Sequence, residues 1–150
     1  LATLKHRQPA DRHEVLGPRE AMVSLSFSHA GRLRQPCKPL TVEELAKLPI
    51  NMRRPRDCVR ARWPVEVELI VNGELRHVGT YAAAGLWSDG PSTIYKRFKV
   101  PVGVTTLDVR LRDSGRRQGF DYTRSLAVDL KAAQNLVIDF HAEQDGFSIL

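Results

Sequence analysis

The chain has 150 residues, of which 42% are hydrophobic and 27% charged, a balance that argues against a wholly disordered chain and against a membrane-embedded one. The length fits a single domain with an ordinary core, and no apolar run approaches the roughly 18 residues of a membrane-spanning helix. The net charge of +6 favours anionic partners in general without naming one.

The first 20 residues are polar and basic, and Pro9, Gly17 and Pro18 interrupt them. We interpret residues 1–20 as a linker or stalk that leads into one domain over residues 21–150. The chain starts at Leu1 rather than at a methionine. A membrane anchor upstream of Leu1 and a trimmed disordered tail are both compatible with that start.

The domain begins with a predicted strand from Met22 to His29, in which Val23, Leu25 and Phe27 alternate with serines. A short helix is predicted next, near residues 40–49. Thr41 and Glu44 have the spacing of a capping box, and Pro49 ends the pattern. A helix of about two turns is too short to be stable alone, so it must be supported by its surroundings.

The two cysteines of the chain, Cys37 and Cys58, flank this helix. A disulfide between them would stabilise the fold by about 3 kcal/mol in the chain-entropy model and would indicate an oxidising compartment such as the periplasm. Two unlinked cysteines in a cytosolic protein would have the same spacing. We favour the disulfide.

From Val65 onward, short segments of alternating apolar and polar residues follow one another. Val65–Val71 leads into Asn72-Gly73, a strong hairpin signal, and Glu74–Tyr81 would return. A strict two-residue turn would place Arg76 beside Leu69 on the inward face. We therefore expect a longer turn, a bulge or a shifted register here.

Further strands are predicted over residues 93–100, 105–113, 122–130 and 135–142. With the strand at Met22, this makes about seven. The pattern predicts a mostly β chain that folds as an antiparallel β-sandwich, with one short helix in an N-terminal excursion.

The segment Phe98–Leu111, in which Pro101 and Gly103 form a turn that feeds a long apolar strand, resembles a segment of immunoglobulin-like bacterial β-sandwich modules. With the polar leader and the cysteine pair, the chain resembles extracytoplasmic domains of uncharacterised membrane-anchored bacterial proteins. Such domains mostly bind or brace other proteins, and some bind carbohydrate. The cysteine–tryptophan–cysteine arrangement of antibody domains is missing, so no residue role transfers.

Catalytic and metal-binding signatures are missing from the sequence. There is no G-x-S-x-G nucleophile elbow and no phosphate-binding glycine loop. The histidines lack zinc-type pairing, and the cysteines are too far apart for a C-x₂₋₄-C site. We therefore predict a protein that is not an enzyme and that needs no cofactor or metal.

The candidate partner-binding residues are arginines and aromatic side chains of predicted loops, together with one aspartate. Arginine and aromatic side chains are common anchors of protein interfaces. The simpler interpretations are a solvated charged face and aromatic rings that close the end of the sandwich, with a Tyr122 hydroxyl that ties a neighbouring loop. The candidates are Arg53, Arg54, Arg56, Trp87, Asp89, Tyr95, Arg116, Arg117, Phe120 and Tyr122.

The leading functional hypothesis is a periplasmic or extracytoplasmic accessory or assembly module of a membrane-anchored bacterial protein, which binds a protein partner in a membrane complex. Carbohydrate binding through Trp87, Tyr95, Phe120 and Tyr122 is the alternative. Nucleic-acid binding through the arginine-rich segments is a weaker one, because Glu66, Glu68, Asp108 and Asp129 lie among the basic residues.

Overall fold

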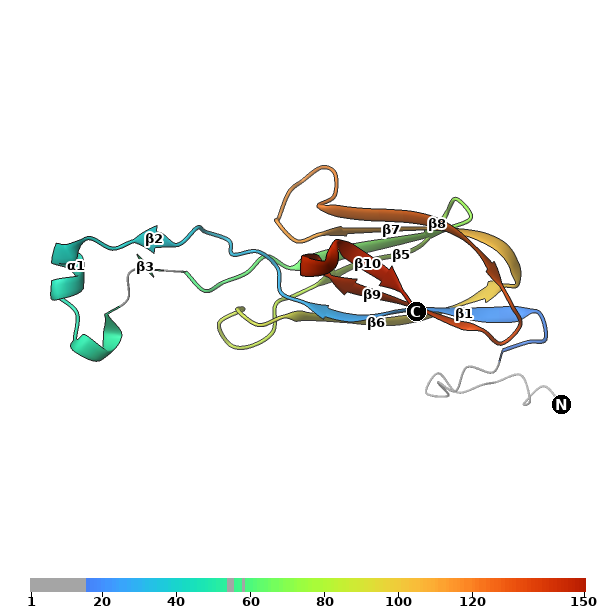
Figure 1. Cartoon of the computed structure of the whole chain (residues 1–150), viewed down its shortest axis with the longest axis horizontal. Helices are drawn as coiled ribbons and strands as arrows, with labels where there is room; N and C mark the ends of the chain where they lie inside the picture. The colour runs from blue at the N-terminus through green and yellow to red at the C-terminus, as the bar shows by residue number, and fades with distance from the viewer. Residues whose placement is uncertain (1–15, 54–55, 58) are drawn as a thin grey trace, which may run out of the picture.

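Two four-stranded sheets pack face to face, and a long arm leaves one end of the sandwich (Figure 1). The computed structural model describes residues 16–53, 56–57 and 59–150. In the first sheet the strand order is β10 (Gly146–Ile149), β9 (Asn135–His141), β1 (Glu20–His29) and β6 (Ser92–Pro101). In the second it is β5 (Glu74–Tyr81), β4 (Val65–Val71), β7 (Gly103–Arg112) and β8 (Tyr122–Leu130). The prediction of a mostly β, two-sheet sandwich is confirmed.

The first sheet is mixed, so the prediction of purely antiparallel pairing was wrong. β1 pairs with β6 in antiparallel fashion but with β9 in parallel, from Met22 opposite Asn135 to Leu25 opposite Ile138. The cause is a short crossing between the sheets over residues 131–134. It connects the end of β8 to a β9 that starts beside the beginning of β1, and the Ala133 amide donates to the Glu20 carbonyl. The two strands then run in the same direction.

The core lies between the sheets and is built by the alternation that the sequence shows. In β4, Val65, Val67 and Leu69 are fully buried, while the glutamates between them are only partly covered. β1 and β7 contribute further inward rows, which include Val23, Leu25, Leu107, Val109 and Leu111. Burial of these rows, at about 25 cal/mol per Å² of apolar surface, is the main term that stabilises the sandwich.

The hairpin between β4 and β5 carries the predicted irregularity. Asn72 and Gly73 both have positive φ, at 52° and 78°, as a two-residue hairpin turn requires. The register shifts between Leu69 and Ile70, which leaves Arg76 without a partner on β4. The bulge keeps Arg76 out of the inward row beside Leu69. The prediction of an irregular hairpin is confirmed.

Two arginines join the sheets along their open sides. On one side Arg76 Nη2 of β5 donates to the Lys99 carbonyl of β6 over 3.1 Å. On the other side Arg124 Nη1 of β8 donates to the Phe147 carbonyl of β10 over 2.7 Å. Both bonds link edge strands of opposite sheets, where backbone carbonyls would otherwise lack a partner.

Beside Arg76, aromatic rings fill the gap between β5 and β6. His77 Nε2 lies 2.6 Å from the Tyr81 hydroxyl, and the His77 ring also packs on Phe98. A Cβ at Gly79 would lie 2.7 Å from His77 Nε2, so glycine makes room for this contact. Burial, followed by the charge of Lys96, lowers the pKa of His77.

The remaining elements are short. The arm carries β2 (Lys38–Pro39), α1 (Val42–Ala46), the 3-10 helix η2 (Ile50–Met52) and β3 (Arg56–Asp57), and a second 3-10 helix, η3 (Ala142–Gln144), precedes β10. The predicted capping box of Thr41 and Glu44 is present, and α1 occupies a shorter range than predicted. Residues 1–15 of the predicted linker lie outside the described residues, and Glu20 already belongs to β1. β10 is a strand that the sequence did not predict.

Replacing Arg124 with methionine is expected to lower the free energy of unfolding by about 1–2 kcal/mol, because the Phe147 carbonyl loses a charged donor. Urea unfolding of the whole chain measures this change. The matched control is Arg97→Met on the exposed face of β6, which should change stability little. Equal effects of the two substitutions would contradict a linking role for Arg124.

Candidate functional site

Most of the predicted binding residues lie at the end of the sandwich from which the arm projects (Figure 1). Three segments meet there: the arm (residues 35–60), the Trp87 loop (residues 82–91) and the arginine loop (residues 113–121). β5 and β7 both run toward this end, so the loops that follow them open on the same side as the arm. We call this region the arm end.

The base of the arm, residues 31–34 and 61–64, is fastened to the sandwich by backbone hydrogen bonds. Its two chain segments pair through a bridge between Leu33 and Arg62. The Arg32 amide donates to the Asp113 carbonyl of the arginine loop, and the Arg62 amide donates to the Ser88 carbonyl of the Trp87 loop. The arm is therefore held from both loops.

Gly31 allows the two segments of the base to approach closely. A Cβ at this position would lie 2.0 Å from the Trp63 carbonyl oxygen, a distance that no side chain tolerates. The Trp63 amide donates to the Arg32 carbonyl over 2.8 Å. The indole of Trp63 lies between Gly115, where a Cβ would meet the ring at 2.4 Å, and the guanidinium of Arg34, 4.5 Å from the ring centroid.

Arg62 reinforces this base with its side chain. Its Nε donates to the Asp89 carbonyl over 3.0 Å, and its Nη1 donates to the Gly31 carbonyl over 2.9 Å. One guanidinium thus bridges the Trp87 loop and the start of the arm. The backbone carbonyl of Asp89 is used for structure, while its carboxylate lies 3.6 Å from Arg60 Nε.

A cluster of charged side chains around the buried Asp113 lies at the arm base. The Asp113 carboxylate is 2% exposed and contacts His29 Nε2 at 2.7 Å and Arg32 Nε at 3.1 Å. Asp121 accepts from the Asp113 amide and from the Ser114 hydroxyl. The cluster connects the end of β1, the start of the arm and both ends of the arginine loop.

The charges in this cluster stabilise one another. The negative charge of Asp113 is the main cause of the raised pKa of Arg32. Burial alone would raise the pKa of Asp121, but hydrogen bonds from the Asp113 amide, Ser114 and Arg116 and the charge of Arg32 together lower it. Asp121 is therefore held as a carboxylate.

Exposed apolar side chains cover the tip of the arm. Val42 is 83% exposed and Ile50 is 82% exposed, and Met52 beside them is also exposed. Arg53 donates to the carbonyls of Leu48 and Ala46, so this predicted binding residue serves to cap the end of α1. The apolar tip was not among the predicted binding residues, although Ile50 and Met52 lack any periodic pattern that would place them in a core.

The cysteine pair is described only in part. Cys58 and Arg54 lie outside the described residues, and the backbone of Arg56 belongs to β3. Lys38, which follows Cys37, pairs with Asp57, which precedes Cys58 in the sequence. The disulfide between Cys37 and Cys58 stays a prediction.

Among the predicted aromatic residues, Trp87 and Tyr95 are exposed, at 66% and 61%. Arg60 lies over the Trp87 ring at 5.4 Å, so an arm residue already covers part of it. Tyr95 lies on β6, opposite Ser26, rather than in a loop. Trp87 does not close the end of the sandwich, contrary to the simpler interpretation of this residue.

Phe120 and Tyr122 are covered. The guanidinium of Arg112 lies 4.4 Å from the Phe120 ring centroid, and Arg110 lies over the same ring. Tyr122 packs edge-on against Phe140 of the core, and after the charge of Asp113 it contributes to the raised pKa of Arg32. Both rings are half-buried within this chain, and Phe120 lies under Arg110 and Arg112 of β7.

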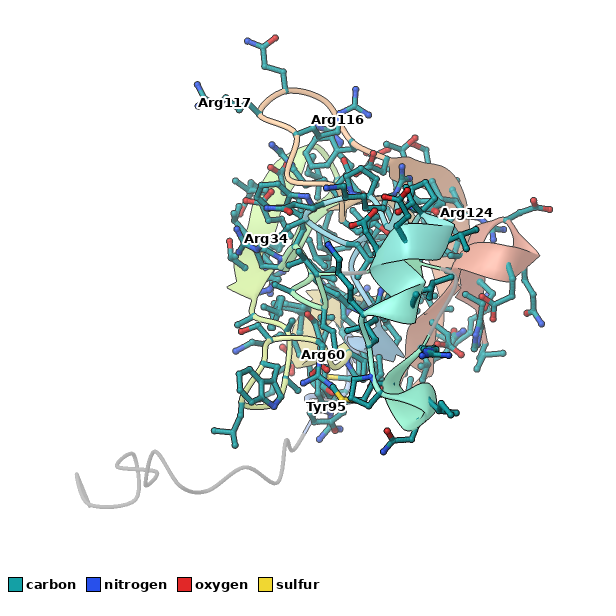
Figure 2. All side chains as sticks on the ribbon, turned by 90° about the vertical axis from the view of Figure 1, so that its left-hand side faces the viewer. Arg34, Arg60, Tyr95, Arg116, Arg117 and Arg124 are labelled. Atoms are coloured by element: carbon teal, nitrogen blue, oxygen red, sulfur yellow. The ribbon has the colours of Figure 1, made fainter. Side chains whose placement is uncertain are left out.

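Arg116 and Arg117 lie on the projecting arginine loop, with Arg34 below them when the molecule is viewed along the arm (Figure 2). Arg116 is paired with Asp121 at 3.3 Å. Arg117 is exposed and its side chain points away from the body of the protein (Figure 2). Arg34 and Trp63 were not predicted as site residues, because their side chains orient each other and the two residues are distant in sequence.

The part of the chain that the structure describes was searched for groups of metal-ligating side chains and for helices that could span a membrane. No group of three or more His, Cys, Asp or Glu side chains there is arranged to hold a metal ion. Among the same residues, no helix is long and apolar enough to cross a membrane.

Comparison with models of protein families, with curated proteins and with solved structures finds no match.

Replacing Asp121 with asparagine is expected to destabilise the fold in a pH-dependent way. The pKa of Asp121 is lowered from its ordinary value of 3.8 in the fold, so its contribution is present at neutral pH and is lost as pH falls through the folded pKa. In urea unfolding, D121N should be less stable than the parent at pH 7, and the difference should shrink toward about pH 3. Asp129→Asn, an exposed carboxylate, is the control. A difference that stays constant with pH would contradict the proposed charge cluster.

Proposed function

We propose that this chain is a non-catalytic, extracytoplasmic accessory module of a membrane-anchored bacterial protein, and that it binds a protein partner through the tip of its arm. The observation that carries the proposal is the exposure of Val42, Ile50 and Met52 on a segment that projects from the sandwich. Large apolar side chains that gather on a projecting surface are typical of protein contact sites.

The charge of the arm indicates the chemistry of the partner. Residues 35–60 contain six lysines and arginines and three aspartates and glutamates, a net charge of +3, which is half of the net charge of the whole chain. The partner surface that fits this arm is an acidic one with an apolar pocket for Ile50 and Val42. Apolar contact would supply most of the affinity, and the charges would steer the approach.

The fastening of the arm supports the same function. A projecting segment loses conformational freedom when it binds, and that loss weakens the complex. Here the base is already held by Gly31, Arg62 and the Asp113 cluster before any partner arrives. An immunoglobulin-like classification of the sandwich and the periplasmic location stay proposals.

Carbohydrate binding is the second candidate, because Trp87 is exposed rather than packed in the core. A sugar-binding site usually needs a platform of aromatic rings, and Phe120 and Tyr122 are covered. Nucleic-acid binding gains little support, since Arg53, Arg62 and Arg116 donate to backbone carbonyls of this chain. Protein binding therefore remains the better proposal.

Replacing Ile50 and Met52 together with glutamate is expected to abolish co-purification of the partner from detergent-solubilised native membranes. Burial of each such side chain contributes about 1.5–3 kcal/mol, so affinity should fall by well over tenfold. Both residues are exposed, so the unfolding curve should not change.

The matched control is Val104→Glu, since Val104 is 77% exposed but lies at the start of β7, away from the arm. A photo-crosslinking amino acid at position 50 should label the same protein that co-purifies, and one at position 104 should not. Co-purification that survives the charged arm tip would contradict the proposal. Glycan binding that is lost in Trp87→Ala would favour the second candidate instead.

A further inference from the structure

A groove of about 370 Å³ lies between the arm base and the arginine loop. Its lining includes Arg34, Trp63, Glu66, Arg112, Arg116 and Arg117. Four arginines and a single glutamate therefore line one small concave surface, with the Arg117 side chain at its rim and pointing outward, and we call this surface the arginine groove. Its volume is at the lower end of the range of small-ligand sites, large enough for one or two side chains.

Two of the four arginines are already neutralised. Arg112 Nε lies 3.2 Å from a Glu66 carboxylate oxygen, and Arg116 Nη1 lies 3.3 Å from Asp121. Among the residues that the structure describes, no carboxylate lies within ion-pair distance of Arg34 or Arg117. The groove thus keeps two uncompensated positive charges.

Contacts within the chain orient the Arg34 guanidinium and fix the backbone of Arg117. Arg34 stacks on the Trp63 indole at 4.5 Å and donates from Nε to the Arg62 carbonyl. Arg112 Nη1 donates to the carbonyls of both Arg116 and Arg117, which fixes the backbone that carries the Arg117 side chain. A guanidinium that is oriented in advance binds a planar oxyanion with less loss of entropy than a free one.

We infer that the arginine groove binds the carboxylates of an acidic peptide segment, one carboxylate at Arg34 and one at Arg117. Guanidinium and carboxylate match in geometry and form paired, charge-assisted hydrogen bonds. Glu66 and Asp121 line or border the groove, and their charges oppose a multiply charged phosphate more strongly than a singly charged carboxylate. The inference rests on the proposed function, because it assigns the acidic segment to the same protein partner that contacts the arm tip.

The test is titration of the whole chain with an acetylated hexaglutamate amide, followed by calorimetry and by amide chemical shifts. The shifts should move at Gly115, Arg116 and Arg117. Arg34→Gln with Arg117→Gln should weaken binding about tenfold for each arginine removed. Arg19→Gln with Arg97→Gln removes the same charge from exposed positions outside the groove and should leave the affinity nearly unchanged.

Three results would overturn the inference: shifts that map outside the arginine groove, equal weakening by the control pair, or inorganic phosphate that binds as tightly as the peptide. The outcome is separable from that of the arm-tip experiment. If R34Q with R117Q leaves peptide binding intact while glutamates at Ile50 and Met52 still abolish co-purification, the groove is not the site and the arm tip is. If R34Q with R117Q weakens peptide binding while glutamates at Ile50 and Met52 leave co-purification intact, the arm-tip proposal fails.

Discussion

The close contact of Gly31 with the Trp63 carbonyl is the constraint on which the rest of the arm end depends. Because Gly31 has no Cβ, the outgoing and returning segments of the arm can pair directly against the sandwich. That pairing places Arg32 over the Asp113 carboxylate and Arg34 over the Trp63 ring. A short backbone approach thereby organises both the buried charge cluster and the arginine groove.

The arginines of this protein act mainly on its own backbone. Arg76 and Arg124 join the edge strands, Arg62 holds the arm base, Arg53 caps α1, and Arg112 and Arg116 hold the arginine loop. Each guanidinium supplies donors to carbonyls that a loop or a strand edge leaves unpaired. Much of the positive charge in the described part of the chain is thus used for structure, whereas arginines such as Arg97 and Arg117 stay exposed.

The sandwich could be predicted from sequence because its strands are amphipathic at period two. The same local reasoning found the bulge at Arg76 and the capping box at Thr41, since both depend on residues close in sequence. The parallel pairing of β1 with β9 and the fourth strand of that sheet, β10, escaped prediction. They depend on the path of the chain between sheets and on a four-residue segment too short to show a period.

The candidate site was harder to predict than the fold, because exposure is decided by distant neighbours. Trp87 and Phe120 are both aromatic residues in loops, yet one is exposed and the other lies under Arg110 and Arg112. The covering of Phe120 depends on how the arginine loop folds back over β7, which the local sequence pattern does not show. Val42 belongs to the predicted short helix, which was expected to be supported by its surroundings, but the arm carries it away from the core and leaves it 83% exposed.

The central claim is that the arm is held firmly at its base, and amide hydrogen exchange tests it most directly. The amides of Arg32, Arg62 and Trp63 donate to carbonyls across the junction, so they should exchange as slowly as those of the central strands β4 and β7. In a Gly31→Ala variant the same amides should exchange much faster while β4 and β7 stay protected. Fast exchange at the junction of the unaltered protein, at the rate of an exposed loop, would contradict the account.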